Sequence, residues 1–184
     1  MTNLRNVLSV FVFLAMIANA GGAAAADPVF YAGVKLGQAN YRYTNVSNNN
    51  QSAFGFLVGL PINETIAIEA EYISLGGFDF PTRTWKGSAL GLSVIGNFPL
   101  NQQFSLLVRL GIASSSLKAT IKPGYTAGYS LTSDRTGLTG GFGGQYNASP
   151  VVAIRVGYDY YPVGDSTIGT TNALVLNVGG VFKF

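Results

Sequence analysis

The stretch at residues 172–184 shows the clearest alternation of hydrophobic and polar positions in the chain. Its apolar side chains share one parity, which Gly180 alone interrupts: Leu174, Leu176, Val178, Phe182 and Phe184. The opposite parity carries Ala173, Asn177 and Lys183. Because successive side chains of a strand point to opposite faces, this pattern predicts a strand with one continuous apolar face. Water would disfavour a face that includes Phe182 and Phe184, whereas lipid would not.

Seven earlier stretches alternate in the same way, at 30–37, 54–60, 66–73, 89–98, 104–112, 138–146 and 152–160. With flanking residues the eight stretches are about 9–13 residues long, and a tilted transmembrane strand needs about 9–11. The segments between them alternate in length. We expect short turns at 61–63, 99–101 and 147–150. Longer loops are expected at 39–51, 75–85, 114–136 and 161–171, although the early part of 114–136 could extend the fifth strand.

Alternating long and short connections are typical of transmembrane barrels, which have long outer loops and tight periplasmic turns. An even number of strands places both termini on the periplasmic side, and closure leaves no backbone edge unpaired in lipid. We therefore predict an all-β fold, an eight-stranded antiparallel up-and-down transmembrane β-barrel in the outer membrane of a Gram-negative bacterium. A soluble lipocalin-like barrel stays open as an alternative, because strand periodicity alone would also allow the aliphatic face to point inward.

The composition favours the membrane barrel. The chain is 48% hydrophobic and only 10% charged, with a mean hydropathy of +0.31, whereas a soluble domain has about 25% charged residues. Cysteine and histidine are both absent, which excludes imidazole-based triads and the usual zinc sites. We therefore expect no enzyme, no cofactor and no metal. Subtracting Arg5 of the predicted signal peptide from the formal net charge of +3 leaves about +2, which is too small and too dispersed to indicate nucleic acid.

Residues 1–26 are predicted to be a secretory signal peptide. Arg5 supplies the charged start, an apolar segment follows at 7–17, and small residues permit cleavage after Ala20 or Ala26. A membrane-spanning helix is disfavoured because the apolar segment is shorter than the roughly 20 residues that a bilayer requires. The predicted barrel domain therefore covers residues 27–184.

Several local runs resemble the eight-stranded membrane domain of the outer membrane protein A type, together with its opacity and small surface-protein relatives. The runs 31–37, 69–76 and 154–158 are similar to the first, third and seventh strands of such proteins. The pattern Asn177, Gly179, Phe182 and Phe184 is similar to the signal that the outer-membrane assembly machinery reads on a last strand. Because the sequence stops at Phe184, we expect no peptidoglycan-binding domain and no wall-anchoring role.

In the barrel interpretation, the positions that alternate with the apolar ones face the lumen. Seven of these positions carry polar side chains: Lys35, Glu69, Glu71, Arg109, Gln145, Arg155 and Asp159. Three cations oppose three carboxylates in an interior that its own side chains fill, so the charges are expected to pair. The resemblance implies a similar core of Arg and Glu, in which Gln145 replaces a carboxylate and leaves Arg155 to seek Glu69 or Glu71. Gating of a narrow ion path by exchange of partners is the alternative.

Glu69 and Glu71 share one strand face and could in principle serve acid–base chemistry, but a structural role is favoured because no histidine is present to complete such a site. Aromatic residues are expected to form two girdles. The periplasmic girdle would contain Phe30, Phe98, Phe104, Tyr146, Phe182 and Phe184, and the outer girdle Phe54, Tyr72, Tyr158 and Tyr160.

The predicted loops carry aromatic and basic side chains that could bind lipopolysaccharide phosphates or host surface polymers, or could simply be solvated: Tyr41, Arg42, Tyr43, Phe78, Phe80, Arg83, Lys118, Lys122, Tyr125 and Tyr129. We expect a non-enzymatic protein for envelope structure and surface-loop display. Its expected partners are outer-membrane lipid and lipopolysaccharide, the assembly machinery and host surface factors. A narrow porin-like channel, an adhesin or immune-evasion protein, and a soluble ligand carrier are the alternatives.

Overall fold

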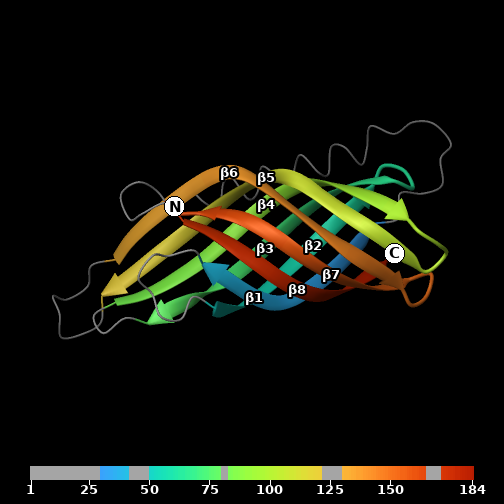
Figure 1. Cartoon of the computed structure of the whole chain (residues 1–184). Coiled ribbons are helices and arrows are strands. Elements are labelled where there is room, and N and C mark those ends of the chain that lie inside the picture. Colours follow the sequence, from blue (N-terminus) through green and yellow to red (C-terminus); the bar gives the residue numbers. More distant parts are fainter. Residues whose placement is uncertain (1–29, 42–49, 80–82, 122–129, 165–170) are drawn as a thin grey trace.

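The computed structural model describes residues 30–41, 50–79, 83–121, 130–164 and 171–184, whose regular structure is eight strands (Figure 1). The strands are β1 (Tyr31–Tyr41), β2 (Asn50–Pro61), β3 (Ile66–Asp79), β4 (Arg83–Pro99), β5 (Phe104–Ile121), β6 (Ser130–Asn147), β7 (Val152–Val163) and β8 (Thr171–Lys183). The predicted signal peptide lies outside the described residues. No helix among them is long and apolar enough to cross a membrane.

The eight strands form one closed barrel in sequence order. Every neighbouring pair is antiparallel, and β1 closes the barrel against β8 from Tyr31 opposite Lys183 to Tyr41 opposite Ala173. The predicted fold class is therefore confirmed. This closure pairs the backbone groups of β1 and β8 that would otherwise form two open edges, and a lipid environment requires such pairing.

Three short turns lie at one end of the barrel, together with Phe184, and this end is called the turn end. In the first turn, the Asn63 side-chain oxygen accepts hydrogen bonds from the backbone amides of Thr65 and Ile66, at 2.9 and 2.8 Å. Asn101 accepts two equivalent bonds in the second turn. Asparagine and serine stabilise tight turns by such bonds to the backbone. The opposite end, where β1, β3, β5 and β7 finish, is called the loop end.

At the loop end the strands run further than their hydrophobic pattern predicts. The expected loops at 39–51, 75–85, 114–136 and 161–171 are each partly strand, and β5 and β6 are 18 residues long. The physical reason is visible on the outward face of β5, where Ile112 is followed by Ser114, Ser116, Lys118 and Thr120. The backbone ladder to β6 continues there although the side chains have become polar. Hydrophobic periodicity therefore marks only the part of each strand that faces apolar surroundings.

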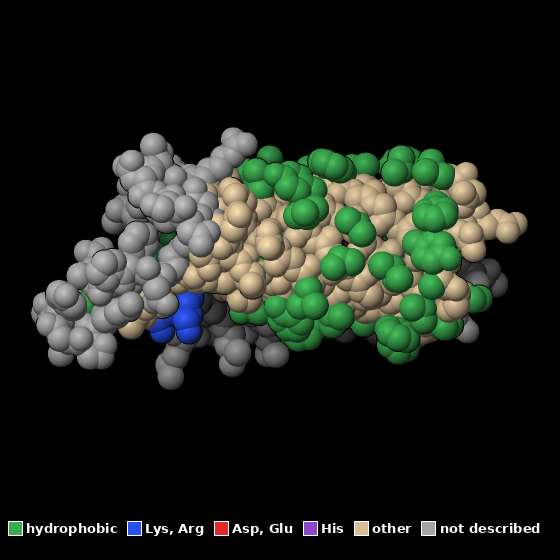
Figure 2. All heavy atoms as spheres, turned by 60° about the horizontal axis from the view of Figure 1, so that its bottom comes forward, with side chains coloured by type: hydrophobic (Ala, Val, Ile, Leu, Met, Phe, Trp, Pro, Cys, Tyr) green, Lys and Arg blue, Asp and Glu red, His purple; other side chains and the backbone are tan. Residues whose placement is uncertain are grey.

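The outward face of the barrel is hydrophobic over most of its height. Leu110 on β5 is 65% exposed and Leu138 on β6 is 70% exposed, while the neighbouring inward positions are largely covered. Figure 2 shows hydrophobic side chains spread over the wall, with basic side chains only near one end of that view. The lipocalin-like alternative is therefore wrong, because it required the aliphatic face to point inward. An apolar band of this kind matches the lipid-facing surface of a transmembrane barrel.

Aromatic residues mark the turn-end edge of this apolar band. Phe98, Phe104 and Phe182 are each about half exposed, and the Phe104 and Tyr146 rings lie 5.0 Å apart between β5 and β6. Toward the loop end, Phe54, Tyr72 and Tyr158 also point outward, but Phe56 and Phe142 occupy intermediate positions. The aromatic residues at the turn end thus lie at one level of the barrel, whereas those toward the loop end are spread along the strands.

Candidate functional site in the barrel lumen

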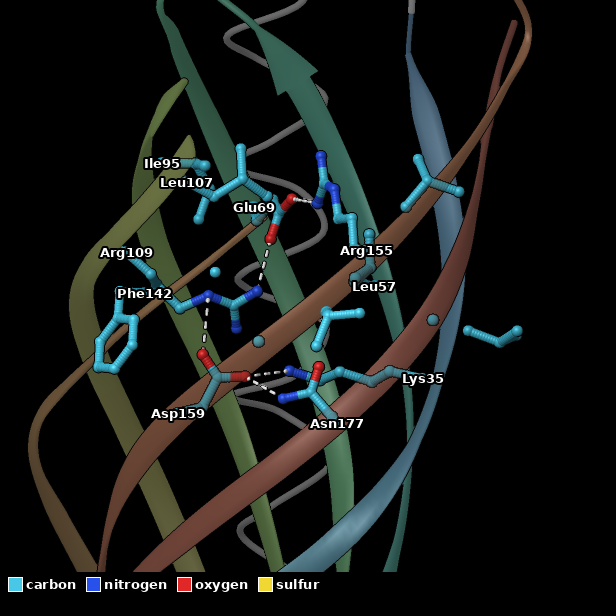
Figure 3. A pocket seen from close by; sticks show the side chains of 16 residues that line it. Lys35, Leu57, Glu69, Ile95, Leu107, Arg109, Phe142, Arg155, Asp159 and Asn177 are labelled. Carbon is cyan, nitrogen blue, oxygen red and sulfur yellow. Dashed lines mark hydrogen bonds and ion pairs between the residues drawn. The ribbon is translucent and has the colours of Figure 1, made fainter. Parts of the chain in front are cut away.

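The lumen residues that the sequence singled out come together in one layer inside the barrel. They project from five strands: Lys35 from β1, Glu69 and Glu71 from β3, Arg109 from β5, Gln145 from β6, and Arg155 and Asp159 from β7. Each occupies an inward position of its strand, and Figure 3 shows Lys35, Glu69, Arg109, Arg155 and Asp159 pointing toward one another. We call this set the charge layer.

Arg109 is the centre of the charge layer because it contacts all three carboxylates. Its Nη2 lies 2.8 Å from Glu69 Oε2, its Nη1 pairs with Glu71, and its Nε lies 3.7 Å from Asp159 Oδ1. A planar guanidinium with donors on several sides suits this position better than a single ammonium would. Removal of Arg109 would therefore affect every carboxylate of the layer at once.

The other two cations serve different carboxylates. Lys35 Nζ lies 2.6 Å from Glu71 Oε2 and 3.1 Å from Asp159 Oδ2. Arg155 pairs with Glu69 through Nη1 and donates from Nε to Gln145 Oε1 at 2.7 Å. The sequence left Arg155 between Glu69 and Glu71, and the structure selects Glu69.

Three further residues complete the hydrogen bonding of the layer. Tyr31 donates its hydroxyl to Glu69 Oε1 at 2.7 Å, and Tyr161 donates to Glu71. The Asn177 side-chain nitrogen donates to Asp159 Oδ2 at 2.8 Å. The prediction that Tyr161 lies in a loop was wrong. Its inward parity continues that of Arg155 and Asp159, and this continuation was the signal in the sequence.

Burial makes these pairings important for stability. The Glu69 side chain is 1% exposed, and those of Glu71 and Asp159 are 3% and 7% exposed. Each carboxylate has at least two cationic or hydroxyl donors, and the layer sums to zero charge. A buried charge that loses its partner costs about 3–5 kcal/mol, although a complete buried pair contributes little net stability. Complete pairing therefore avoids the cost of an isolated buried charge, although the layer as a whole adds little net stability.

Hydrophobic side chains fill the lumen on both sides of the charge layer. The loop-end cluster contains Ala39, Tyr41, Ala53, Ile73, Leu75, Ala89, Ala113, Leu117, Tyr161, Val163, Ala173 and Val175, with Trp85 packed against it. The turn-end cluster contains Tyr31, Leu57, Ala67, Ile95, Ala153 and Val181, with Leu107 packed against it. The described interior is thus apolar, charged and apolar along its length.

A cavity of about 40 Å³ lies beside the charge layer, lined in part by Lys35, Glu69 and Arg109 (Figure 3). A cavity of this volume has room for a few water molecules, since one water molecule needs about 10–15 Å³. Both Glu69 and Glu71 are held by Arg109, so neither is presented as a free base to this space. The described residues contain no group of three or more His, Cys, Asp or Glu side chains placed to hold a metal.

Of the residues expected in surface loops, Tyr41 is placed differently. It is fully buried in the loop-end cluster and donates its hydroxyl to the Leu75 carbonyl oxygen at 2.9 Å, so its assignment to a ligand-binding loop was wrong. Lys118 is exposed but belongs to β5. Phe78 belongs to β3 and Arg83 to β4, so both lie in strands and not in a loop. The remaining loop candidates lie outside the described residues: Arg42, Tyr43, Phe80, Lys122, Tyr125 and Tyr129.

The four residues of the expected assembly signal lie on both faces of β8. Phe182 and Phe184 point outward and are 57% and 77% exposed, whereas Asn177 and Gly179 occupy inward positions beside the charge layer. The Phe184 amide donates to the Phe30 carbonyl oxygen at 2.8 Å, which continues the pairing of β8 with β1. Asn177 therefore has a structural contact in the lumen in addition to any role in assembly.

Residues 11–182 match the family described as outer membrane protein beta-barrel domain. The chain belongs to this family. It is 29% identical over 196 residues to outer membrane protein A of Salmonella typhi, covering 98% of this chain and 55% of that protein. The chain thus spans about half the length of the curated relatives it matches. Family and fold together identify an outer-membrane β-barrel.

Solved structures share the architecture at low sequence identity. Neisserial surface protein A superimposes with a TM-score of 0.64 at 22% identity, covering 84% of this chain and 97% of that chain. Ail, the attachment invasion locus protein of Yersinia pestis, superimposes with a TM-score of 0.59 at 17% identity, covering 85% of this chain and 97% of that chain. At these identities the likeness concerns the fold.

Proposed function

We propose that this protein is a non-enzymatic outer-membrane barrel with a closed lumen, which contributes to envelope structure and displays its loop end on the cell surface. The arrangement of the lumen carries this proposal. A charge layer of zero net charge lies between two hydrophobic clusters that fill the described lumen on both sides of it, as expected for an eight-stranded barrel whose interior is just wide enough for its own side chains. In this proposal the barrel wall supports the loop-end connections, and the packed side chains of the interior close the lumen.

The proposed orientation places both termini and the three short turns in the periplasm. Its support is the asymmetry of the two ends, since short turns face the periplasm and longer loops face outward in barrels of this kind. The three turns leave only 62–65, 100–103 and 148–151 between strands. The loop end would then carry the four connections that are exposed to the surroundings of the cell.

Conductance measurement tests the closed lumen. The purified barrel in planar lipid bilayers is expected to give no discrete current steps at moderate voltage. A double variant, Leu117→Ala with Leu75→Ala, opens the loop-end cluster but leaves the charge layer intact, and it should still be non-conducting because the turn-end cluster remains. Regular single-channel steps from the unmodified protein would overturn the proposal in favour of the narrow channel.

Binding to host surfaces is a second candidate function. Ail is described as an attachment invasion locus protein. In this chain, a barrel wall that extends beyond the apolar band in β5 and β6 would hold the loop-end connections away from the membrane. Shortening the connection between Tyr41 and Asn50, or that between Ile121 and Ser130, should then reduce adhesion of bacteria to host cells without reducing barrel assembly. Unchanged adhesion of both deletion strains would contradict this candidate.

A further inference from the structure

Two lysines lie side by side on the outer wall near the loop end. Lys86 of β4 and Lys118 of β5 are direct cross-strand partners, and both are exposed on the outward face. Directly opposed residues have Cβ atoms about 4.5–5.5 Å apart, and like charges in this arrangement destabilise a sheet. Neither lysine forms an ion pair with any described residue. Within the described residues, the pair therefore brings two positive charges together without an ion-paired carboxylate.

Small polar residues surround the lysine pair. On the two lysine-bearing strands, Ser88 faces Ser116 on one side of the pair and Thr84 faces Thr120 on the other. On the neighbouring strands, Lys118 faces Thr132, and Lys86 faces Gly77. A Cβ added at Gly77 would lie 3.2 Å from Lys86 Cγ, so the absence of a side chain leaves room for the lysine stem. Asp134, opposite Ser116, is exposed and forms no ion pair with Lys118.

The lysine pair lies just beyond the apolar band. Lys86 lies four positions before Leu90, the last hydrophobic outward residue of β4. This corresponds to about 13 Å along the strand and about 10 Å along the membrane normal at a tilt of about 40°. The headgroup layer adds only about 5–8 Å to each side of the hydrocarbon. Lysine side chains bend back toward the interface. The ammonium groups therefore reach the level of the lipid phosphates.

We infer that Lys86 and Lys118 form a docking surface for the phosphate of a phosphorylated glycolipid in the outer leaflet. Two adjacent ammonium groups can hold one dianionic phosphate, which removes their mutual repulsion, and the neighbouring hydroxyl groups add hydrogen-bond donors. A lipid is favoured over a soluble anion because its acyl chains would lie on Leu90, Leu92 and Ile112 directly below. This inference rests on the proposed orientation, in which the loop end faces the outer leaflet.

The main test compares lipid retention by matched variants. The full barrel is placed in detergent micelles with diphosphoryl lipid A or with dephosphorylated lipid A, and retained lipid is counted by native mass spectrometry. The double variant Lys86→Gln with Lys118→Gln should retain diphosphoryl lipid A at least about tenfold less well than the unmodified protein, because each lysine near a lipid surface contributes attraction. Lys86→Arg with Lys118→Arg should restore retention. Retention of dephosphorylated lipid A should be weak in all variants.

Two controls make the test specific. Lys183→Gln removes one positive charge at the turn end and should leave lipid A retention unchanged. Inorganic phosphate, at the same concentration of phosphate groups, should neither compete with lipid A nor raise the unfolding temperature. Equal retention of lipid A by the glutamine double variant and the unmodified protein would overturn the site, and effective competition by inorganic phosphate would overturn the assignment to a lipid.

A charge reversal gives an independent readout. Lys118→Glu replaces the repulsion of the pair by attraction to Lys86, so in lipid-free micelles the unfolding temperature should rise. Added diphosphoryl lipid A should then raise it less than it does for the unmodified protein. A fall in lipid-free stability, or an undiminished response to lipid A, would contradict the inference.

The orientation is tested separately. The substitution Ser130→Cys places a thiol at the loop end, and this cysteine should react with a membrane-impermeant maleimide on intact cells, because the chain has no cysteine of its own. If it is protected in cells whose purified barrels still bind lipid A in micelles, the proposed orientation and the outer-leaflet assignment fail. If it is labelled but lipid A retention does not depend on Lys86 and Lys118, the site alone fails.

Discussion

At the scale of single residues, the charge layer depends unequally on its members. Arg109 contacts three carboxylates, whereas Arg155 contacts Glu69 alone among them and shares its remaining hydrogen bond with the neutral Gln145. Arg155 also lies 4.9 Å from the centre of the Tyr31 ring and its side chain is slightly more exposed than that of Arg109. The two arginines thus differ in how much buried charge each one compensates.

Replacing Arg109 by methionine should lower the free energy of unfolding by about 3–5 kcal/mol, because Glu69, Glu71 and Asp159 all lose a partner in a buried environment. Arg155→Met is the matched comparison and should lower it less. Urea unfolding of the refolded barrel in lipid vesicles, followed by the fluorescence of the single tryptophan, Trp85, measures both. Equal effects of the two substitutions would contradict the central role of Arg109.

Pairing within the layer can be isolated by a double-mutant cycle. Lys35→Met should leave Glu71 and Asp159 short of one donor, and Glu71→Gln should leave Lys35 and Arg109 with an excess of positive charge. The double variant removes one charge of each sign, so it should be destabilised by less than the sum of the single variants. Additive losses in the same unfolding measurement would show that the two residues act independently.

At the scale of elements, the backbones of neighbouring strands lie close together where an inward-facing position is glycine. Gly143 of β6 lies opposite Gly157 of β7, and a Cβ at Gly143 would meet the Val156 carbonyl oxygen of the backbone. At Gly180 of β8, which faces outward, a Cβ would find no heavy atom within 4 Å. The close backbone therefore leaves no room for a side chain at Gly143. At Gly180, nothing in the described structure excludes a larger residue.

Gly143→Ala should destabilise the barrel by about 1–3 kcal/mol, because the new methyl group overpacks against backbone that cannot rotate away. Gly180→Ala is the matched control and should leave stability unchanged or slightly raised. The fraction of protein with heat-modifiable mobility on cold gels, measured against urea concentration, gives both values. A tolerated alanine at Gly143 would mean that β6 and β7 can separate without loss.

The strand β8 also carries the proposed assembly signal. Phe184 is 77% exposed at the turn end, so Phe184→Ala removes little packing inside the protein. We expect this substitution to lower the amount of barrel assembled in the outer membrane of cells more than it lowers the unfolding free energy of the purified, refolded protein. Phe104→Ala is the control, because it removes an aromatic side chain of the same edge from another strand. Equal assembly defects in the two variants would argue against a signal specific to β8.

At the scale of the whole molecule, the outward face divides into an apolar band and a polar wall beyond it. On β5 the band extends from Phe104 to Ile112, and the wall continues through Ser114 to Thr120 with an unbroken backbone ladder. The barrel wall of β5 therefore extends past the apolar band at the loop end. This division also fixes where substitutions should matter, because lipid penalises charge only within the band.

A charge introduced in the middle of the band should be costly in proportion to its depth. Val108→Arg, at a position that is 49% exposed midway along the band of β5, should lower the free energy of unfolding in lipid by about 2–4 kcal/mol. Leu100→Arg, in the turn between β4 and β5, should change it by about 0–1 kcal/mol. Stability measurements in bilayers of two thicknesses would also shift the value for Leu100 more than that for Val108. Similar losses at both positions would contradict the assigned band.

The sequence by itself determined the number of strands, their faces and the membrane environment. A strand alternates with a period of two, so the parity of Leu106, Val108 and Arg109 could be read directly, and each points as predicted. Sequence did not determine where the strands end. Tyr41 and Tyr161 were assigned to loops because hydrophobic alternation stops where the wall leaves the apolar band, although the hydrogen-bonded ladder and the packed lumen continue.

Only the tertiary structure decided which charges pair. Arg155 and Glu69 are 86 positions apart in the chain, and their meeting depends on the register of every strand between them and on the closure of β8 against β1. Register also brought Lys86 opposite Lys118, which no local pattern indicates. The physical reason is that side-chain parity follows from the covalent geometry of one strand, whereas neighbours across a barrel follow from the stagger of all eight.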